Sequence, residues 1–299
     1  MLIFHRVLAV HDPLQPSEPT MQQFEARMAW LKSCFNVIPL GAAVAGIRGS
    51  PLPPRALAIT FDDGYADNRE LAAPILARLG LPATFFIATG FLDGGRMFND
   101  TVIETVRNST HLALGDLGLG EYALPDASAK RSAIAAILER LKYLPTAERA
   151  RLASRIEERA GSALAPSQMM RSAQVAELRQ MGFDVGGHTV SHPILAAVNV
   201  EEARREIVQG RLRLEQIVGA RVPHFAYPNG RPGRDYRKEH VVIVREAGFD
   251  GAVSTAPGVS RRGADRFQLP RFTPWDRANW RFGLRLARNH FQSVPGAPD

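Results

Sequence analysis

The sequence predicts an α/β fold in which the strands of a parallel sheet alternate with covering helices along most of the chain. Its short runs of Ile, Val and Phe are continuous and do not alternate with polar residues, as in strands that are covered on both faces. Between these runs, apolar residues recur at a spacing of three or four, which is typical of helices. A barrel-like sheet and an open, doubly wound sheet both produce this pattern.

The expected elements follow one another in a regular order. The predicted strands lie at 2–5, 36–40, 57–61, 83–88, 182–187, 223–227 and 250–255. The predicted helices between them lie at 69–79, 167–181 and 199–219. Gly80 and Gly219 are placed to end the first and third helices, because glycine adopts the left-handed conformation of a C-cap. Asn199 followed by Glu202 matches a capping box that opens the third helix.

Residues 92–165 interrupt the alternation of strands and helices. This stretch contains a Gly-rich join at 115–120 and two helical segments, at 128–142 and 146–160. We interpret it as a helical insertion, a layer or lid, within a single domain at 1–285. The remaining residues, 286–299, are expected to form a C-terminal tail.

Composition excludes several classes of protein. The chain has 299 residues, 45% of them hydrophobic, and a formal charge of +7. The arginines are scattered, without the dense basic tract that nucleic-acid binding requires, so the charge indicates a preference for acidic glycans or membrane headgroups. The single cysteine, Cys34, excludes an internal disulfide and a site with several thiolates.

No stretch of the sequence has the apolar length of a membrane-spanning helix. In the opening MLIFHRVLAVHD, the apolar run is too short for a signal peptide and charged residues follow it too early. We therefore expect a cytoplasmic location, unless a leader precedes Met1 in the native protein. Peripheral contact with a membrane is compatible with the positive charge, and the sequence gives no indication of oligomeric state.

Two adjacent carboxylates follow the predicted strand at 57–61. Asp62 and Asp63 stand in the run TFDDG. Neighbouring carboxylates repel each other unless one of them holds a cation or a proton. Asp-Asp-Gly alone is common turn chemistry, so the pair needs a partner elsewhere in the chain.

That partner is provided by two histidines after another predicted strand. His188 and His192 stand four residues apart in GGHTVSHP, after the strand at 182–187. The carboxyl ends of parallel strands meet at one rim of a barrel, and two imidazoles with one carboxylate suit Zn²⁺ or another divalent transition metal. With Asp63 as the third ligand and Asp62 free as a base, hydrolysis of an amide or ester is the natural reaction.

The two motifs together resemble those of the polysaccharide deacetylases, the NodB-homology group of metal-dependent carbohydrate esterases related to carbohydrate esterase family 4. The resemblance implies a distorted (β/α) barrel that removes N-acetyl groups from amino sugar units of a polysaccharide or lipid-linked glycan. It also implies that Asp62 is the base and that Asp63, His188 and His192 bind the metal.

A third stretch, FAYPNG at 225–230, resembles the family motif whose backbone helps to form the oxyanion hole. The amide donor here would be that of Asn229. Its neighbours Tyr227, Pro228 and Gly230 would form the floor of the sugar site.

Two positions depart from the family pattern. Ala226 stands where the family often has an arginine that holds the base, and the arginines that might replace it are Arg231, Arg234 and Arg271. Arg271, in LPRF, also stands where the family usually has a histidine that acts as general acid. His5, at the end of the first predicted strand, is our candidate for this missing proton donor. The alternative for His5 is an ordinary histidine at the rim.

Two other functions remain open, the first of them because of these departures. The first is a carbohydrate-binding protein that keeps the scaffold without turnover. The second is a metal amidase of a non-sugar substrate, since the metal ligands and the base recognise only the amide that is cleaved.

Overall fold

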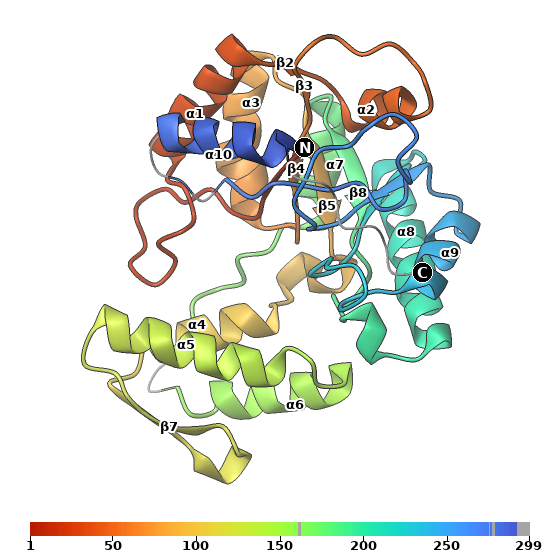
Figure 1. Ribbon diagram of the computed structural model, residues 1–299. Coiled ribbons are helices and arrows are strands. Elements are labelled where there is room, and N and C mark those ends of the chain that lie inside the picture. The colour runs from red at the N-terminus through yellow and green to blue at the C-terminus, as the bar shows by residue number, and fades with distance from the viewer. Residues whose placement is uncertain (161–162, 275, 277–278, 292–299) are drawn as a thin grey trace.

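The computed structural model describes residues 1–160, 163–274, 276 and 279–291. Its centre is a curled sheet of six parallel strands in the order β1-β4-β5-β8-β9-β10 (Figure 1). These strands are β1 (Leu2–Phe4), β4 (Ile59–Phe61), β5 (Thr84–Ile87), β8 (Asp184–Gly187), β9 (His224–Ala226) and β10 (Gly251–Val253). Every strand residue except Asp184 is buried, which confirms that the continuous apolar runs are covered on both faces.

The segment 269–272 connects the two edges of this sheet. Leu269 forms a parallel bridge with Val253 of β10, and Phe272 forms one with Leu2 of β1. The backbone N–H of Phe272 donates to the carbonyl oxygen of Met1 at 2.9 Å. The sheet is therefore a distorted (β/α) barrel, as the family resemblance implied, and not an open doubly wound sheet.

Helices cover the outside of the barrel on both sides in Figure 1. They are α1 (Met21–Cys34), α2 (Leu40–Ile47), α3 (Ala73–Leu79), α7 (Ser172–Gln180), α8 (Val200–Val218), α9 (Lys238–Glu246) and α10 (Asn279–Phe291). Aromatic rings join the strands to these helices. The Phe61 ring lies 5.4 Å from Phe4 and 4.8 Å from Phe85, centroid to centroid, and 5.8 Å from Phe24 of α1. This packing ties three adjacent strands to one helix.

The predicted strand at 36–40 is wrong in length and in place. Only β2 (Asn36–Val37) is extended, and it pairs with β3 (Ala56–Leu57) in a separate two-stranded sheet. Pro39 caps α2, which begins at Leu40. The predicted strand at 57–61 is likewise divided between β3 and β4. Proline has no N–H to give to a sheet, so the chain turns into a helix at this point.

The predicted helix at 167–181 begins later than expected. Met169 forms an antiparallel bridge with Tyr65, so the chain stays extended before α7. The Asp93 carboxylate then accepts hydrogen bonds from the backbone N–H and hydroxyl of Ser172, where α7 starts. The other two helices lie where predicted, with a π-helical turn (Asn68–Ala72) before α3, and the Asn199 side chain accepts from the backbone N–H of Glu202 at 2.9 Å.

The stretch predicted as an insertion forms a layer below the barrel in Figure 1. It contains α4 (Phe98–Arg107), β6 (His111–Leu114), β7 (Gly120–Ala123), α5 (Ala127–Leu141) and α6 (Thr146–Glu157). These elements pack around their own apolar cluster, which includes Val106, Leu114, Ile137 and Ile156. The Gly-rich join at 115–120 is the turn of the β6–β7 hairpin, with Gly118 at φ 71°. Three short helical turns complete the described elements: Thr89–Gly94, Gly115–Leu117 and Leu195–Ala197.

The C-terminal segment is helical where the structure describes it. Helix α10 continues to Phe291 and so crosses the predicted boundary between the domain and the tail. The rest of the predicted tail, 292–299, lies outside the described residues. Within the described residues, no helix combines the length and apolarity needed to cross a membrane.

Candidate metal and catalytic site

A tight turn after β4 points the two neighbouring carboxylates in different directions. The backbone N–H of Asp62 donates to the carbonyl oxygen of Phe4 and so extends the pairing with β1. Asp63 has a left-handed backbone, with φ 77°, and Gly64 follows at φ 96°. Such conformations are uncommon outside glycine and concentrate at functional sites. The turn thus gives Asp62 and Asp63 separate surroundings.

Asp62 is held by Arg271, which the sequence could place only as one of three candidates. The two guanidinium Nη atoms donate to the two Asp62 carboxylate oxygens, both at 2.6 Å. Arg271 also donates to the Thr60 hydroxyl and the Ser254 carbonyl, each at 3.0 Å. Both charged side chains are buried, and a bidentate pair of this kind fixes orientation as well as charge.

Burial raises the pKa of Asp62, but the charges of Arg271 and then His188 outweigh it, so this pKa lies below its ordinary value. Asp62 is therefore an oriented carboxylate that is ionised at neutral pH. Its Oδ2 lies 3.9 Å from His188 Nε2, and Asp62 is not among the three residues whose ligand atoms converge.

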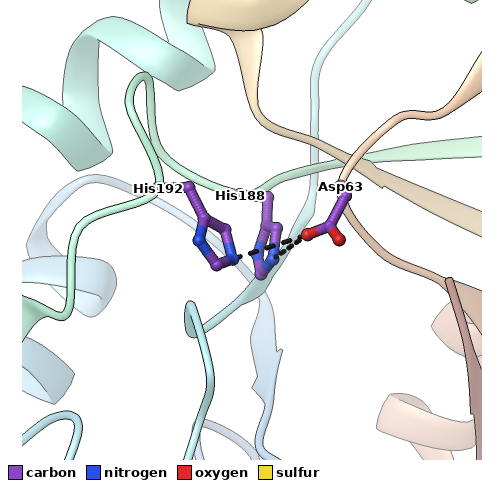
Figure 2. A group of neighbouring side chains, drawn as sticks. All are labelled: Asp63, His188 and His192. Atoms are coloured by element: carbon purple, nitrogen blue, oxygen red, sulfur yellow. Dashed lines mark ion pairs between the residues drawn. The ribbon is translucent and has the colours of Figure 1, made fainter. Parts of the chain in front are cut away.

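Asp63 instead faces both histidines of the second motif (Figure 2). Its Oδ1 lies 3.4 Å from Nε2 of His188 and 3.4 Å from Nε2 of His192. One ligand atom from each of the three buried residues lies within 4.8 Å of the others, close enough for a single metal ion. The His188 Nδ1 lies 2.7 Å from the Ala226 carbonyl oxygen, so Nδ1 carries a proton and the ring is oriented with Nε2 towards Asp63.

The protonation states of this cluster suit a cation. Burial lowers the pKa of His192 to about 3, so its imidazole is neutral and can coordinate. Burial raises the pKa of Asp63, but the hydrogen bond with His188 and further electrostatic effects of the two histidines lower it by more, to well below its usual range. Burial lowers the pKa of His188, yet Asp62 and Asp63 raise it above normal. Together the two carboxylates thus attract positive charge to this point, as a metal site requires.

Two residues outside the motifs hold the histidine loop, and both were missed by sequence analysis. Glu206 of α8 accepts hydrogen bonds from the backbone N–H groups of Val190 and Ser191, each at 2.8 Å. Arg149 of α6 donates to the carbonyl oxygens of Ser191 and His192 at 3.2 and 3.1 Å. Glu206 lies in α8, whose many charged residues are typical of a solvent-exposed helix. Nothing in the sequence therefore singled it out.

The cluster opens into a cavity of about 640 Å³. Asp62, Asp63, His188 and His192 line it, together with His5 and Asn229. His5 thus lies at the same rim as Asp63, His188 and His192, as predicted, and the Asn68 side chain donates to its backbone carbonyl at 2.8 Å. Asn229 has φ 58°, and its backbone N–H has no acceptor among the described residues.

The structure does not bring the other three predicted contact residues of the FAYPNG stretch into the cavity lining. The Tyr227 ring, just after β9, is fully buried in the hydrophobic core and stacks on Tyr236 with centroids 3.8 Å apart. Pro228 is also buried. Gly230 shapes the turn, since a Cβ there would lie 2.9 Å from the Tyr227 carbonyl oxygen. The cavity lining therefore gives no support to the predicted contacts of Tyr227, Pro228 and Gly230 with substrate.

Of the other two candidate partners of the base, neither reaches Asp62. Arg234 lies 3.9 Å from Glu139 of α5, and Arg231 lines the outer part of the cavity. Arg271 occupies the position for which the family's general acid was expected, but its guanidinium is committed to the base. Ala226 supplies the carbonyl oxygen that orients His188.

Comparisons with known proteins agree with this geometry. The family model described as polysaccharide deacetylase matches residues 49–114 and 146–252. The curated Bacillus subtilis (strain 168) protein "Putative polysaccharide deacetylase YxkH" is 20% identical over 273 residues, which cover 91% of this chain and 69% of the relative.

Solved structures show the same fold. IcaB from Ammonifex degensii is 18% identical with a TM-score of 0.63, and the match covers 96% of this chain and 95% of that one. The Streptococcus pyogenes deacetylase PplD, in complex with acetate, is 18% identical with a TM-score of 0.59, over 91% and 90% of the two chains. Because the family model also matches more than half of the residues, the chain belongs to the polysaccharide deacetylase family.

Proposed function

We propose that this protein is a metal-dependent hydrolase that removes N-acetyl groups from amino sugar units of a polysaccharide or lipid-linked glycan. The observation that carries the proposal is the different environment of two adjacent aspartates. Asp62 is held by Arg271 at 2.6 Å, whereas Asp63 faces the Nε2 atoms of two histidines at 3.4 Å. An oriented base beside a three-ligand metal site is the arrangement that amide hydrolysis requires.

The metal would be held by Asp63, His188 and His192, with Zn²⁺ as the default and other divalent transition metals as alternatives. The donor set fits, because two neutral imidazole nitrogens and one carboxylate oxygen converge in a buried position. When bound, such an ion polarises the acetyl carbonyl and lowers the pKa of a water molecule.

The residues of the chain would then divide the proton transfers between them. Asp62 takes a proton from the attacking water as its oxygen bonds to the acetyl carbon, and Arg271 keeps that carboxylate ionised and oriented. The Asn229 N–H donates to the developing oxyanion, an interaction that commonly contributes about 3–4 kcal/mol. His5 gives a proton to the leaving nitrogen as the C–N bond breaks, which releases acetate and the free amine.

The pairing of Arg271 with Asp62 weakens the case for a binding protein without turnover. That alternative arose because the arginine expected at Ala226 is absent, and Arg271 provides the same guanidinium from another strand position. The alternative of a non-sugar amidase is tested by substrate choice, since the catalytic groups act on the amide alone.

The test measures acetate release from an N-acetylglucosamine oligosaccharide, with and without a chelator, alongside the metal content of the protein. We expect Asp62→Asn to lower kcat by about 10²- to 10⁴-fold while the metal content stays unchanged, and His188→Ala to lose both metal and activity. Asp250→Asn, at an exposed carboxylate paired with Arg221, is the matched control and should behave as the parent protein. Full activity in chelator or in Asp62→Asn, or preference for a peptide or formyl amide, would contradict the proposal.

A further inference from the structure

One face of helix α5 forms a wall of the catalytic cavity. The α5 residues at the cavity are Ala135, Leu138 and Glu139, followed by Lys142 at the C-cap. Their spacing of three, one and three residues places them on a single helical face. Residues of the opposite face, such as Ile134 and Ile137, pack into the apolar cluster of the insertion. The helix is thus held by its own small core while it presents a fixed surface to substrate.

This wall lies outside the part of the chain that the family model matches. The matched segments end at residue 114 and resume at 146, so the unmatched stretch contains all of α5. A residue that touches the substrate from α5 therefore adjusts what this chain accepts without being part of the shared catalytic motifs.

Two cations in the cavity lining have no carboxylate within ion-pair distance in the part of the chain that the structure describes. Lys142 is half-buried at the end of α5, and Arg231 is exposed in the loop after β9. Among the described residues, neither side chain forms an ion pair; the Lys142 ammonium only lies 5.7 Å from the Tyr143 ring centroid. A half-buried ammonium without an anion is unfavourable, so these positions are suited to a negatively charged ligand.

The nearby carboxylates are already engaged. The Asp235 carboxylate accepts from the backbone N–H of Arg231 at 3.0 Å and from the Tyr143 hydroxyl at 3.4 Å. Glu139 is closest to Arg234, at 3.9 Å.

The remaining acid of the cavity lining outside the catalytic pair is Glu18. Burial raises its pKa, and the opposing effects of His5 and Arg6 do not fully offset this; the cations that act on it are those two residues and not Lys142 or Arg231.

The electrostatics of Lys142 agree with a missing anion. Burial lowers its pKa most. Among the neighbouring charges, Asp235 has the largest effect and raises this pKa, Arg231 and Arg234 lower it, and Glu139 raises it least. Three cations thus gather on one side of the cavity, and a bound anion would relieve their mutual repulsion.

We propose that Lys142 and Arg231 form an anion-binding subsite beside the catalytic centre, which selects acetylated glycans that carry a phosphate or carboxylate group near the acetamido sugar. This inference rests on the proposed function, because it names the class of substrate for the same cavity. Ala135 and Leu138 provide the apolar surface between the anion and the reacting sugar.

The experiment compares three substrates of equal length: a neutral N-acetylglucosamine oligosaccharide, the same chain with one phosphate monoester, and the same chain with one terminal carboxylate. We expect kcat/KM for at least one anionic chain to exceed that for the neutral chain by about fivefold or more, as expected for roughly 1 kcal/mol. This preference should shrink as salt is added. Which anionic chain is preferred identifies phosphate or carboxylate as the recognised group.

Substitutions then assign the preference to the two cations. Lys142→Gln and Arg231→Gln should each reduce the ratio of anionic to neutral kcat/KM towards one, while Lys142→Arg should retain it. Arg151→Gln on α6 removes an exposed charge from the same insertion but outside the cavity lining, and should leave the ratio unchanged.

The outcomes separate this inference from the proposed function. Equal kcat/KM for all three chains, or a preference that survives both glutamine substitutions, overturns the subsite while the deacetylase function stands. If no chain is hydrolysed, the proposed function fails. Calorimetric binding of the same chains to the unmodified protein still tests the subsite, which is overturned if the anionic chains bind no more tightly than the neutral one.

Discussion

The ion pair between Arg271 and Asp62 gives the most demanding test of how this site is built. Arg271→Met keeps an unbranched side chain of similar reach but removes all four hydrogen bonds of the guanidinium. Asp62, which is 2% exposed, would then be a buried carboxylate without a counter-ion. Removing one partner of a buried pair costs about 3–5 kcal/mol, so we expect the free energy of unfolding at pH 7 to fall by that amount.

The loss should depend on pH with a definite sign. In the parent protein the pKa of Asp62 is below its ordinary value, so the pair stabilises the fold above about pH 4 and loses this effect as the pH falls through the folded-state pKa. In Arg271→Met, burial without the guanidinium raises the pKa of Asp62. The carboxylate is then protonated as the pH falls, which removes the cost of burying its charge. The difference between the two proteins should therefore be largest near neutral pH and shrink towards pH 4.

Urea unfolding in the presence of a chelator, at pH 4.5 and pH 7, measures this difference without a contribution from bound metal. Arg221→Met is the matched control. Arg221 also forms a bidentate pair, with Asp250 at 2.6 and 3.0 Å, but both partners are half exposed, so about 1 kcal/mol or less is expected. A loss at position 271 no larger than at 221, or one that does not vary with pH, would refute the reasoning.

Three further predictions concern the surroundings of the site. Burial raises the pKa of Asp100 to about 7, so the fold is stabilised while this carboxyl is protonated and loses that stabilisation as the pH rises from about 4 through 7. At pH 8, Asp100→Asn should be more stable than the parent towards urea by more than about 1 kcal/mol. Parallel pH dependences of the unfolding free energy in the two proteins would contradict this. A Cβ on Gly186 would lie 2.3 Å from the Phe86 ring. Gly186→Ala should therefore lower the free energy of unfolding by at least about 1–3 kcal/mol, whereas Gly41→Ala, whose Cβ has 3.6 Å of clearance, should not. Glu206→Gln loosens the backbone of the histidine loop and should weaken metal affinity about 10- to 100-fold, measured by competition with a chelator; unchanged affinity would show that the loop needs no support from α8.

The grouping of Asp63, His188 and His192 could be predicted from sequence because all three lie in the segments that follow buried strands. Asp63 follows β4, and His188 and His192 follow β8, so a parallel sheet brings them to one rim whatever the details of the loops. His5 reached the same rim by the same argument, as the residue after β1. Tyr227 shows where this argument ends, because the direction of a side chain depends on the alternation within β9 and on what packs against it.

The sequence by itself determined the alternation of strands and helices, the rim at which the polar motifs meet, and the residue types that suit a metal. These properties depend on local periodicity and on spacing within a few residues, so short segments of the sequence are enough to predict them. Only the tertiary structure decided which arginine holds Asp62, since Arg271 is 209 residues away and approaches it only because the segment 269–272 joins the two edges of the sheet. It likewise decided that α5 faces the cavity, because which face of a helix meets the substrate depends on the packing of the whole insertion.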